Sequence, residues 1–242
     1  MKFLLFFLAG ILVLIGLLFL FLFLCSLFVD PKKEYDKDGR FYRALLNGAT
    51  GAALKLLRIR VQVSGEEKLP ADSPVLFVCN HRSNFDPIIT WYVFRKYRPA
   101  FISKEANFHI PFFGRFIRRC CFMAIDREDP REAMKTIRRA AALLKEGEMS
   151  VGVYPEGTRS RSGELLPFHN GVFKIAQLAD VPIAVLSIKG TETIHKNVPF
   201  HASSVRLDVL DVLPAGQIRS LRTADIGGRI REEISEKLAS GQ

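Results

Sequence analysis

Cysteine is scarce in this sequence: four cysteines occur among 242 residues, and they lack the spaced pairs typical of a zinc site. Cys120 and Cys121 are adjacent, Cys25 lies in a long apolar run, and Cys79 lies in a short one. The histidines show no metal-ligand spacing either. The sequence therefore predicts buried, reduced thiols and no bound metal.

Charge is absent from residues 3–29. As an α-helix this run would be about 40 Å long, more than the roughly 30 Å hydrocarbon core of a bilayer. A cleaved signal peptide is the alternative, but its apolar core is usually about 7–15 residues long and ends at small residues. Residues 25–29 offer no convincing cleavage site. We expect residues 1–30 to form a tilted transmembrane anchor.

Positive charge is distributed unevenly around this run, because Lys2 alone precedes it while Lys32, Lys33, Lys37 and Arg40 follow it. Positive charge is retained on the cytoplasmic side. We therefore expect a single-pass protein of the cell membrane whose globular part faces the cytoplasm. That part carries almost all of the net charge of +10. Beside an anchor such charge indicates anionic lipid, and no basic run is interleaved with aromatic residues as in nucleic-acid-binding proteins.

Strand-like and helix-like segments alternate after residue 57. The expected strands are 58–63, 74–79, 99–103, 150–154, 181–188 and 204–212. The expected helices are 87 to about 96, 130 to about 146, about 171–179, and 223–238. This alternation predicts an α/β fold with a mixed, largely parallel sheet covered by helices, and a site at the carboxyl ends of the strands.

The segment Asn80–Asp86, NHRSNFD, places a histidine and a carboxylate five positions apart after an expected strand. On one helix the two side chains would point about 140° apart. A shared site therefore requires a loop, which Ser83 and Asn84 favour. A histidine held by a carboxylate is typical of a general base. The alternative is that Asp86 caps a helix that has Pro87 at its first position, beside an ordinary loop histidine.

A second segment, residues 151–163, runs from an apolar strand into a loop that contains glycine, hydroxyl side chains and two arginines. Backbone N–H groups near glycine and the fork of a guanidinium suit an oxyanion such as a phosphate. A polar hairpin with solvated arginines is the alternative. It explains less well why Glu156 stands directly before Gly157.

Together, NHRSNFD at 80–86 and YPEGTRS at 154–160 resemble the NHxxxxD and (F/Y)PEGTRS motifs of the glycerolipid acyltransferase family, which includes the lysophosphatidic acid acyltransferases and their glycerol-3-phosphate relatives. Residues 124–127 and 181–183 resemble two weaker motifs in the same order. The likeness covers about residues 55–215. This chain departs from the family at Asn170, where relatives commonly carry lysine, and this leaves Lys104, Arg127, Arg159 and Arg161 as the candidate cations.

The resemblance implies transfer of a fatty acyl group from acyl-CoA or acyl carrier protein to 1-acyl-sn-glycerol 3-phosphate, with phosphatidic acid as product and no cofactor or metal. It implies that His81 is the general base and that Asp86 orients it. The residues implied for substrate binding are Glu156, Gly157, Thr158, Arg159, Lys104 and Arg127.

In detail, the resemblance implies that Glu156 and Gly157 position the acceptor and that Arg159, with Lys104 or Arg127, holds its phosphate. The chain then divides into the anchor 1–30, a linker with a membrane-proximal amphipathic helix at 31–60, and an acyltransferase domain at 61–242. The implied partners are membrane lipids, the lysophosphatidic acid acceptor and the acyl donor, and no nucleic acid.

Several alternatives stay open on the sequence alone. Another acceptor, such as glycerol 3-phosphate or a different lysophospholipid, fits the same motifs. A non-catalytic lipid-binding protein or a phosphatase with a histidine nucleophile fits them less well. Residues 41–57 suit either an amphipathic helix on the bilayer or a core helix. Residues 110–119 suit a membrane-dipping helix, the wall of an acyl-chain tunnel, or the core.

Overall fold

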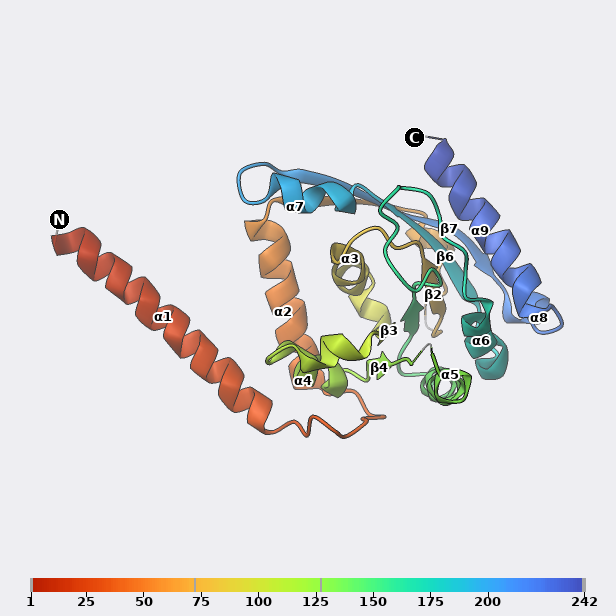
Figure 1. Cartoon of the computed structure of the whole chain (residues 1–242), viewed down its shortest axis with the longest axis horizontal. Helices are drawn as coiled ribbons and strands as arrows, with labels where there is room; N and C mark the ends of the chain where they lie inside the picture. Colours follow the sequence, from red (N-terminus) through yellow and green to blue (C-terminus); the bar gives the residue numbers. More distant parts are fainter. Residues whose placement is uncertain (1, 72, 127, 241–242) are drawn as a thin grey trace.

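A sheet of seven strands is the centre of the described part of the chain, residues 2–71, 73–126 and 128–240 of this computed structural model (Figure 1). Its spatial order is β1-β7-β6-β2-β5-β3-β4. The strands are β1 Ile59–Ser64, β2 Leu76–Cys79, β3 Ala100–Ser103, β4 Met123–Ala124, β5 Val151–Val153, β6 Ile183–Lys189 and β7 Ser203–Leu213. All neighbours are parallel except β6 and β7, which are antiparallel. The predicted mixed, largely parallel sheet is confirmed.

Helices cover both faces of this sheet. The longer ones in the domain are α2 Arg40–Leu56, α3 Phe85–Val93, α4 Phe113–Arg119, α5 Pro130–Lys145, α6 Lys174–Ala179 and α9 Thr223–Ala239. Alternate side chains of β2 point to opposite faces: Leu76 and Val78 join the core formed with α5, α6 and α9, whereas Phe77 and Cys79 join the core formed with α2 and α3. Because both faces are buried, the strand is continuously apolar, as expected for a central parallel strand.

Some elements differ from the sequence-based prediction. The edge strand β4 was not predicted, because two residues are too few to show a periodicity. The short helices α7 Ile194–Asn197 and α8 Ala215–Ile218 were also missed. The predicted helix at 171–179 begins instead as a 3₁₀ turn, Asn170–Phe173, and the aromatic segment 110–119 is helical only from Phe113 onward.

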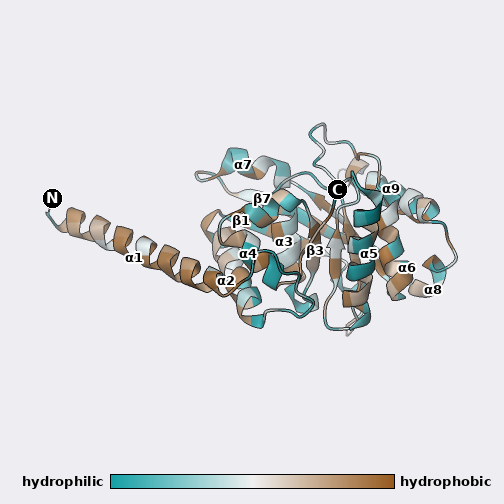
Figure 2. Ribbon diagram, turned by 60° about the horizontal axis from the view of Figure 1, so that its bottom comes forward, coloured by the Kyte–Doolittle hydropathy of each residue, from teal (hydrophilic) through white to brown (hydrophobic). Residues whose placement is uncertain are grey.

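A long apolar helix, α1 Lys2–Leu27, leaves the domain (Figures 1 and 2). Among the described residues it is the one helix long and apolar enough to cross a membrane, with a mean hydropathy of 3.1 over its most apolar stretch, none of which is buried. Its last turn touches the domain. Arg115 Nη1 donates to the carbonyl of Ser26 at 2.8 Å, and Tyr42 Oη donates to that of Cys25 at 3.0 Å.

Buried ion pairs hold the linker and α2 against the domain. The side chain of Asp38 is 1% exposed, and its Oδ2 accepts hydrogen bonds from Arg43 Nε at 2.6 Å and Arg98 Nη2 at 3.1 Å. The Arg43 guanidinium also donates to the carbonyl of Pro99 at 3.1 Å and lies over the Trp91 ring, 4.5 Å from its centroid. The start of α2 is therefore held at a fixed place on the core.

We predict that Arg43→Met lowers the free energy of unfolding by about 3 kcal/mol, because it leaves the buried Asp38 carboxylate short of a partner. The matched control is Arg40→Met, which removes an exposed arginine from the same helix and should change stability by less than about 0.5 kcal/mol. Denaturant unfolding of the detergent-solubilised chain measures both. Equal stabilities of the two variants would contradict the structural role of Arg43.

Candidate active site

The loop after β2 is held by Asn80 at the point where the strand ends. Asn80 Nδ2 donates to the carbonyl of Ile188 at 2.9 Å, and its Oδ1 accepts from the N–H of Ile188 at 2.8 Å. The buried amide thus joins the end of β2 to the end of β6. Because β2, β3, β5 and β6 are parallel, the segments that follow them meet at one edge of the sheet, as the sequence predicts.

His81 and Asp86 are brought together on this loop, with His81 Nδ1 2.8 Å from Asp86 Oδ2. Asp86 is fully buried. Its Oδ2 also accepts from the backbone N–H groups of Arg82 and Ser83, both at 2.6 Å, and its Oδ1 accepts from Thr191 Oγ1 at 2.5 Å. A carboxylate surrounded by donors is an acceptor, so the proton lies on His81 Nδ1 and Nε2 keeps its lone pair.

The alternative interpretation, in which Asp86 caps a helix with Pro87 at its first position, is wrong. Helix α3 begins at Phe85, with Asn84 at the N-cap position and no side-chain cap. Asp86 lies in the first turn, where the helix dipole favours a negative charge. Its carboxylate points back to the N–H groups of the preceding loop, because those donors and His81 are within its reach.

The ring of Tyr154 packs against the imidazole of His81. The rings of His81 and Tyr154 lie with their centroids 4.6 Å apart at an interplanar angle of 35°. Tyr154 Oη forms a 2.7 Å hydrogen bond with Thr90 Oγ1. Burial raises the pKa of Tyr154 well above its usual value, and the nearby acidic groups Cys79 and Asp86 add to this. Tyr154 is therefore a neutral packing partner.

Glu156 lies behind His81. It is 3% exposed, its Oε1 accepts from the N–H of His81 at 2.6 Å, and its Oε2 accepts from the N–H of Leu166 at 2.9 Å. Burial raises the pKa of this carboxyl, and the two N–H donors and His81 oppose the rise. Ser160 N–H donates to the carbonyl of His81 at 2.9 Å. Glu156 and Ser160 thus join the two motif loops.

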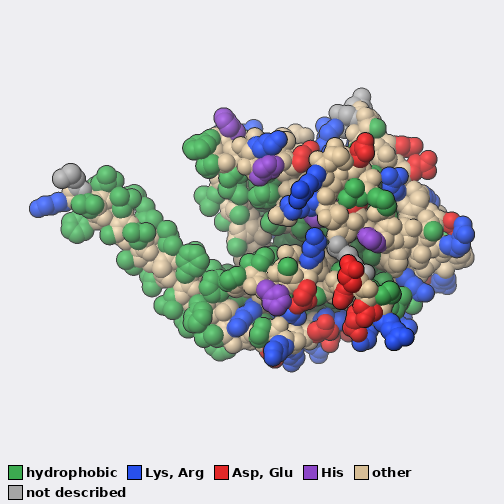
Figure 3. All heavy atoms as spheres, viewed as in Figure 1, with side chains coloured by type: hydrophobic (Ala, Val, Ile, Leu, Met, Phe, Trp, Pro, Cys, Tyr) green, Lys and Arg blue, Asp and Glu red, His purple; other side chains and the backbone are tan. Residues whose placement is uncertain are grey.

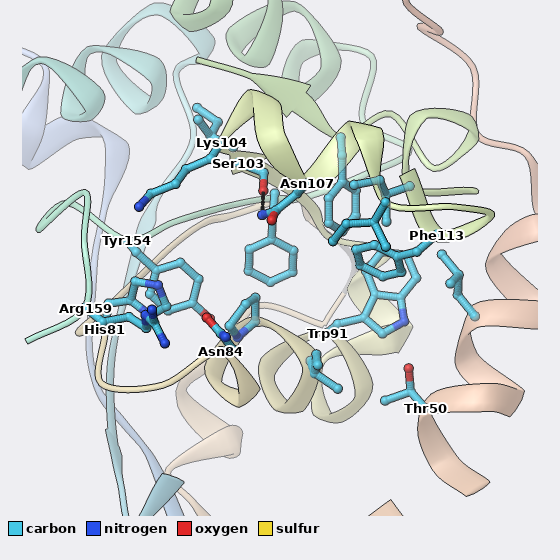
Figure 4. A pocket seen from close by; sticks show the side chains of 18 residues that line it. Thr50, His81, Asn84, Trp91, Ser103, Lys104, Asn107, Phe113, Tyr154 and Arg159 are labelled. Atoms are coloured by element: carbon cyan, nitrogen blue, oxygen red, sulfur yellow. Dashed lines mark hydrogen bonds between the residues drawn. The ribbon is translucent and has the colours of Figure 1, made fainter. Parts of the chain in front are cut away.

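A cavity of about 440 Å³ opens beside His81 (Figure 4). Its walls are mainly apolar and aromatic, from Leu46, Pro87, Ile88, Trp91, Phe101, Ile102, Ile110, Phe113, Ile117 and Phe122. Its polar residues are Thr50, His81, Asn84, Ser103, Lys104, Asn107, Tyr154 and Arg159. Figure 4 shows His81, Tyr154, Lys104 and Arg159 on one side of the cavity and Trp91 and Phe113 on the other.

The predicted substrate-binding residues fall into two groups. Lys104, which follows β3, and Arg159, which follows β5, both line the cavity and are exposed. Glu156, Gly157 and Thr158 do not line it, and their predicted contact with an acceptor stays a prediction.

Arg127 and Asn170 are two other positions that the sequence singled out. Arg127 lies outside the described residues. The family position occupied by Asn170 faces helix α9, since Asn170 Oδ1 lies 2.0 Å from the place where a Cβ on Gly227 would be. Asn170 therefore points away from the cavity.

Thr191 is a site residue that sequence reasoning missed, and Asn80, although it opens the first motif, was given no role. Both hold the His81 loop, and both act through partners more than a hundred positions away. The one available signal was that Thr191 follows the end of an expected strand, at the edge where the site was predicted. Its pairing with Asp86 is visible only once β2 and β6 are neighbours.

Comparison with known proteins identifies the family of the chain. Residues 60–189 match the family model described as Acyltransferase, and the chain belongs to this family. It is 36% identical over 136 residues to a chloroplastic 1-acyl-sn-glycerol-3-phosphate acyltransferase of Brassica napus, covering 56% of this chain and 39% of that protein. It is 25% identical over 189 residues to the 1-acyl-sn-glycerol-3-phosphate acyltransferase of Escherichia coli, covering 78% of this chain and 77% of that one.

The fold is also similar to a solved structure. The crystal structure of PlsC, the 1-acyl-sn-glycerophosphate acyltransferase of Thermotoga maritima, matches with a TM-score of 0.67 and 25% identity, covering 82% of this chain and 78% of that one. The chain spans less than half the length of the Brassica protein and of a relative from Chlamydomonas reinhardtii, of which it covers 48%. The similarity to these two proteins therefore concerns only part of each.

We predict that Thr191→Val lowers the free energy of unfolding by about 1.5–3 kcal/mol, the usual range for a hydrogen bond to a charged group. The valine keeps the shape of threonine but removes the donor to Asp86 Oδ1. Thr193→Val is the matched control, because its exposed hydroxyl bonds only the nearby carbonyl of Gly190. Thermal and denaturant unfolding compare the two variants, and a Thr191→Val protein as stable as Thr193→Val would show that Asp86 does not depend on this donor.

Proposed function

We propose that this protein transfers a fatty acyl group from a thioester donor, acyl-CoA or acyl carrier protein, to 1-acyl-sn-glycerol 3-phosphate, and so makes phosphatidic acid for phospholipid biosynthesis. One observation carries the proposal: an imidazole held by a buried carboxylate lies at one side of an apolar cavity, next to two cations. The two relatives compared above are named 1-acyl-sn-glycerol-3-phosphate acyltransferases, which supports this choice of acceptor.

In the proposed reaction, His81 Nε2 accepts the proton of the acceptor hydroxyl while that oxygen attacks the thioester carbonyl. Asp86 stabilises the imidazolium that forms. The tetrahedral intermediate then collapses, the C–S bond breaks, and the imidazolium protonates the leaving thiolate. The products are an ester and a free thiol. A thioester is already activated, so the step needs no cofactor beyond its donor.

The apolar part of the cavity suits an acyl chain. Its volume falls within the usual range of roughly 300–1,000 Å³ for ligand pockets. Three aromatic side chains form one wall, because Phe122 lies 5.3 Å from Trp91 and 5.6 Å from Phe101 between ring centroids. Gly152 makes room for Phe101, since a Cβ there would lie 2.3 Å from the Phe101 ring. An apolar, aromatic wall of this kind suits an alkyl chain.

Lys104 and Arg159 are the residues that we propose for the phosphate of the acceptor. They come from neighbouring strands and lie on the His81 side of the cavity (Figure 4). A guanidinium offers two parallel donors to phosphate oxygens. Gly157, in the loop that carries Arg159, has a φ of 70°, in the left-handed region that favours glycine. We propose that Glu156 positions the His81 loop from behind.

We further propose that α1 crosses the cell membrane once and that the domain lies on the cytoplasmic face. The length and hydropathy of α1 support the crossing. The cations that follow α1 support the orientation. Membrane lipids would then be both the surroundings and the source of acceptor.

The test is a thiol-release assay with palmitoyl-CoA and with an acylated carrier protein, across a panel of acceptors. The panel contains 1-acyl-sn-glycerol 3-phosphate, glycerol 3-phosphate and lysophospholipids with other headgroups, and the lipid product is identified by mass. Preference for 1-acyl-sn-glycerol 3-phosphate supports the proposal. Release of phosphate without thiol would identify a phosphatase, and binding without turnover would identify a lipid-binding protein.

We predict that His81→Ala lowers the rate of acyl transfer by about 10²–10⁴-fold, the usual contribution of a general base, without loss of the fold. His81 borders the open cavity, so shortening its side chain widens this space and leaves no sealed void. His195→Ala removes an exposed histidine of α7 and should leave the rate unchanged. Near-normal turnover by His81→Ala in detergent would exclude the proposed mechanism.

We predict that Arg159→Lys raises the KM for 1-acyl-sn-glycerol 3-phosphate and lowers kcat, because an ammonium attracts the phosphate without fixing its orientation. The loss should be smaller for an acceptor that lacks the phosphate. Arg161→Lys, two positions further along the same loop and outside the cavity lining, is the control. Equal losses on phosphorylated and dephosphorylated acceptors would assign Arg159 to bracing the loop.

A further inference from the structure

The loop of residues 198–202, between α7 and β7, exposes an aromatic side chain. Among the described residues after the linker, Phe200 and Leu56 are the most exposed large hydrophobic side chains, each with 79% of its surface accessible. Water contact with side chains of this size is unfavourable, and grouped exposed apolar residues mark interaction surfaces.

Phe200 is held next to the end of α2, where Leu56 lies. Arg58 Nη1 donates to the carbonyl of Phe200 at 3.1 Å, and the N–H of Ser203 donates to the carbonyl of Arg58 at 3.2 Å. Within the loop, the N–H of His201 donates to the carbonyl of Asn197 at 2.7 Å. The loop therefore has a defined shape that presents Phe200 outward.

This loop, α2 and α1 share one side of the molecule. In Figures 1 and 2, α1 extends away from the side formed by α2 and by the loop after α7. Figure 3 shows hydrophobic side chains along that edge, continuing onto α1. The first turn of α2 adds Phe41, which is 55% exposed. The apolar edge is thus continuous with the helix proposed to cross the membrane.

The oblique direction of α1 is compatible with a bilayer that touches this whole edge (Figure 1). Its 26 residues are about 39 Å long, more than the roughly 30 Å of hydrocarbon, so the helix can cross while tilted. Exposed cations lie beside the apolar side chains: Lys55, Arg58 and Arg60 near the end of α2, and Lys196 in α7. Apolar side chains rimmed by cations are typical of surfaces that enter the headgroup region of anionic membranes.

We propose that the loop of residues 198–202 is a second membrane contact, in which Phe200 and Leu56 enter the leaflet on the domain side of α1. This inference rests on the proposed membrane attachment of α1. It gives the domain a fixed orientation on the bilayer. Because Leu46 and Thr50 of α2 line the cavity, α2 at the membrane surface brings the cavity next to the lipid.

Brominated-lipid quenching in the full chain tests the contact directly. Phe200→Trp adds an indole to a chain whose one native tryptophan, Trp91, is buried, and Leu221→Trp is the matched control at an exposed leucine beyond α8. Both proteins are reconstituted into vesicles with shallow brominated phospholipids. We expect at least about twofold stronger quenching of the added tryptophan at position 200, since bromine quenches only near contact. Equal quenching overturns the proposal, whether the loop faces water or a second copy of the chain.

A kinetic assay tests whether the contact of Phe200 with the membrane aids turnover of acceptor in a bilayer. Phe200→Ser should lower kcat/KM on acceptor embedded in vesicles by about three- to tenfold, because it removes one of two linked attachments, and should leave turnover in detergent micelles unchanged. Leu221→Ser should alter neither. Equal losses in both assays would assign Phe200 to the fold and overturn the proposal. The quenching arm requires no turnover, so it separates failure of this contact from failure of the proposed reaction, and vesicle flotation separately reports on α1.

Discussion

The buried carboxylate of Asp86 is the constraint on which the site depends. A charge removed from water is very unfavourable unless donors surround it. Its donors come from His81, from the backbone of Arg82 and Ser83, and from Thr191 after β6. Few conformations of the loop bring all of these donors to the carboxylate. The interactions that keep Asp86 buried therefore also fix the direction of the imidazole. Stability and the proposed catalysis therefore depend on the same hydrogen bonds.

Local sequence predicted the parts of the site that are close together in the chain. The five-residue spacing of His81 and Asp86, with loop-forming residues between them, predicted that the two could share a site, but on its own it left a capping aspartate beside an ordinary loop histidine as an alternative. The same spacing did not reveal that the Asp86 carboxylate points from the first helical turn back to the preceding loop. An aspartate that caps a helix and one that binds the preceding loop can have the same neighbouring residues in the sequence. Thr191 and the role of Asn80 were missed because their partners are brought near only by the sheet.

The aromatic wall of the cavity could not be predicted from local sequence either. Strand alternation predicted a sheet with its site at the carboxyl ends, and the topology confirms this sheet. It did not predict that Trp91 from α3, Phe101 from β3 and Phe122 after α4 would form one wall, because aromatic residues in separate elements carry no sign of contact. Gly152 could have been assigned to a close approach, but the ring that requires it belongs to a different strand.

Helix α2 connects the cavity, the linker and the apolar edge. Leu46 and Thr50 face the cavity, whereas Phe41 and Leu56 are exposed. The sequence left open whether this helix is amphipathic and membrane-facing or packed in the core, and the packing gives it one buried side and one exposed side. The Asp38–Arg43 pair holds its first turn, and the Arg58–Phe200 contact lies just beyond its last. Because Arg43 also stacks on Trp91, a displacement of α2 would disturb the cavity wall, so a membrane that held this helix would also hold the proposed acyl site in shape.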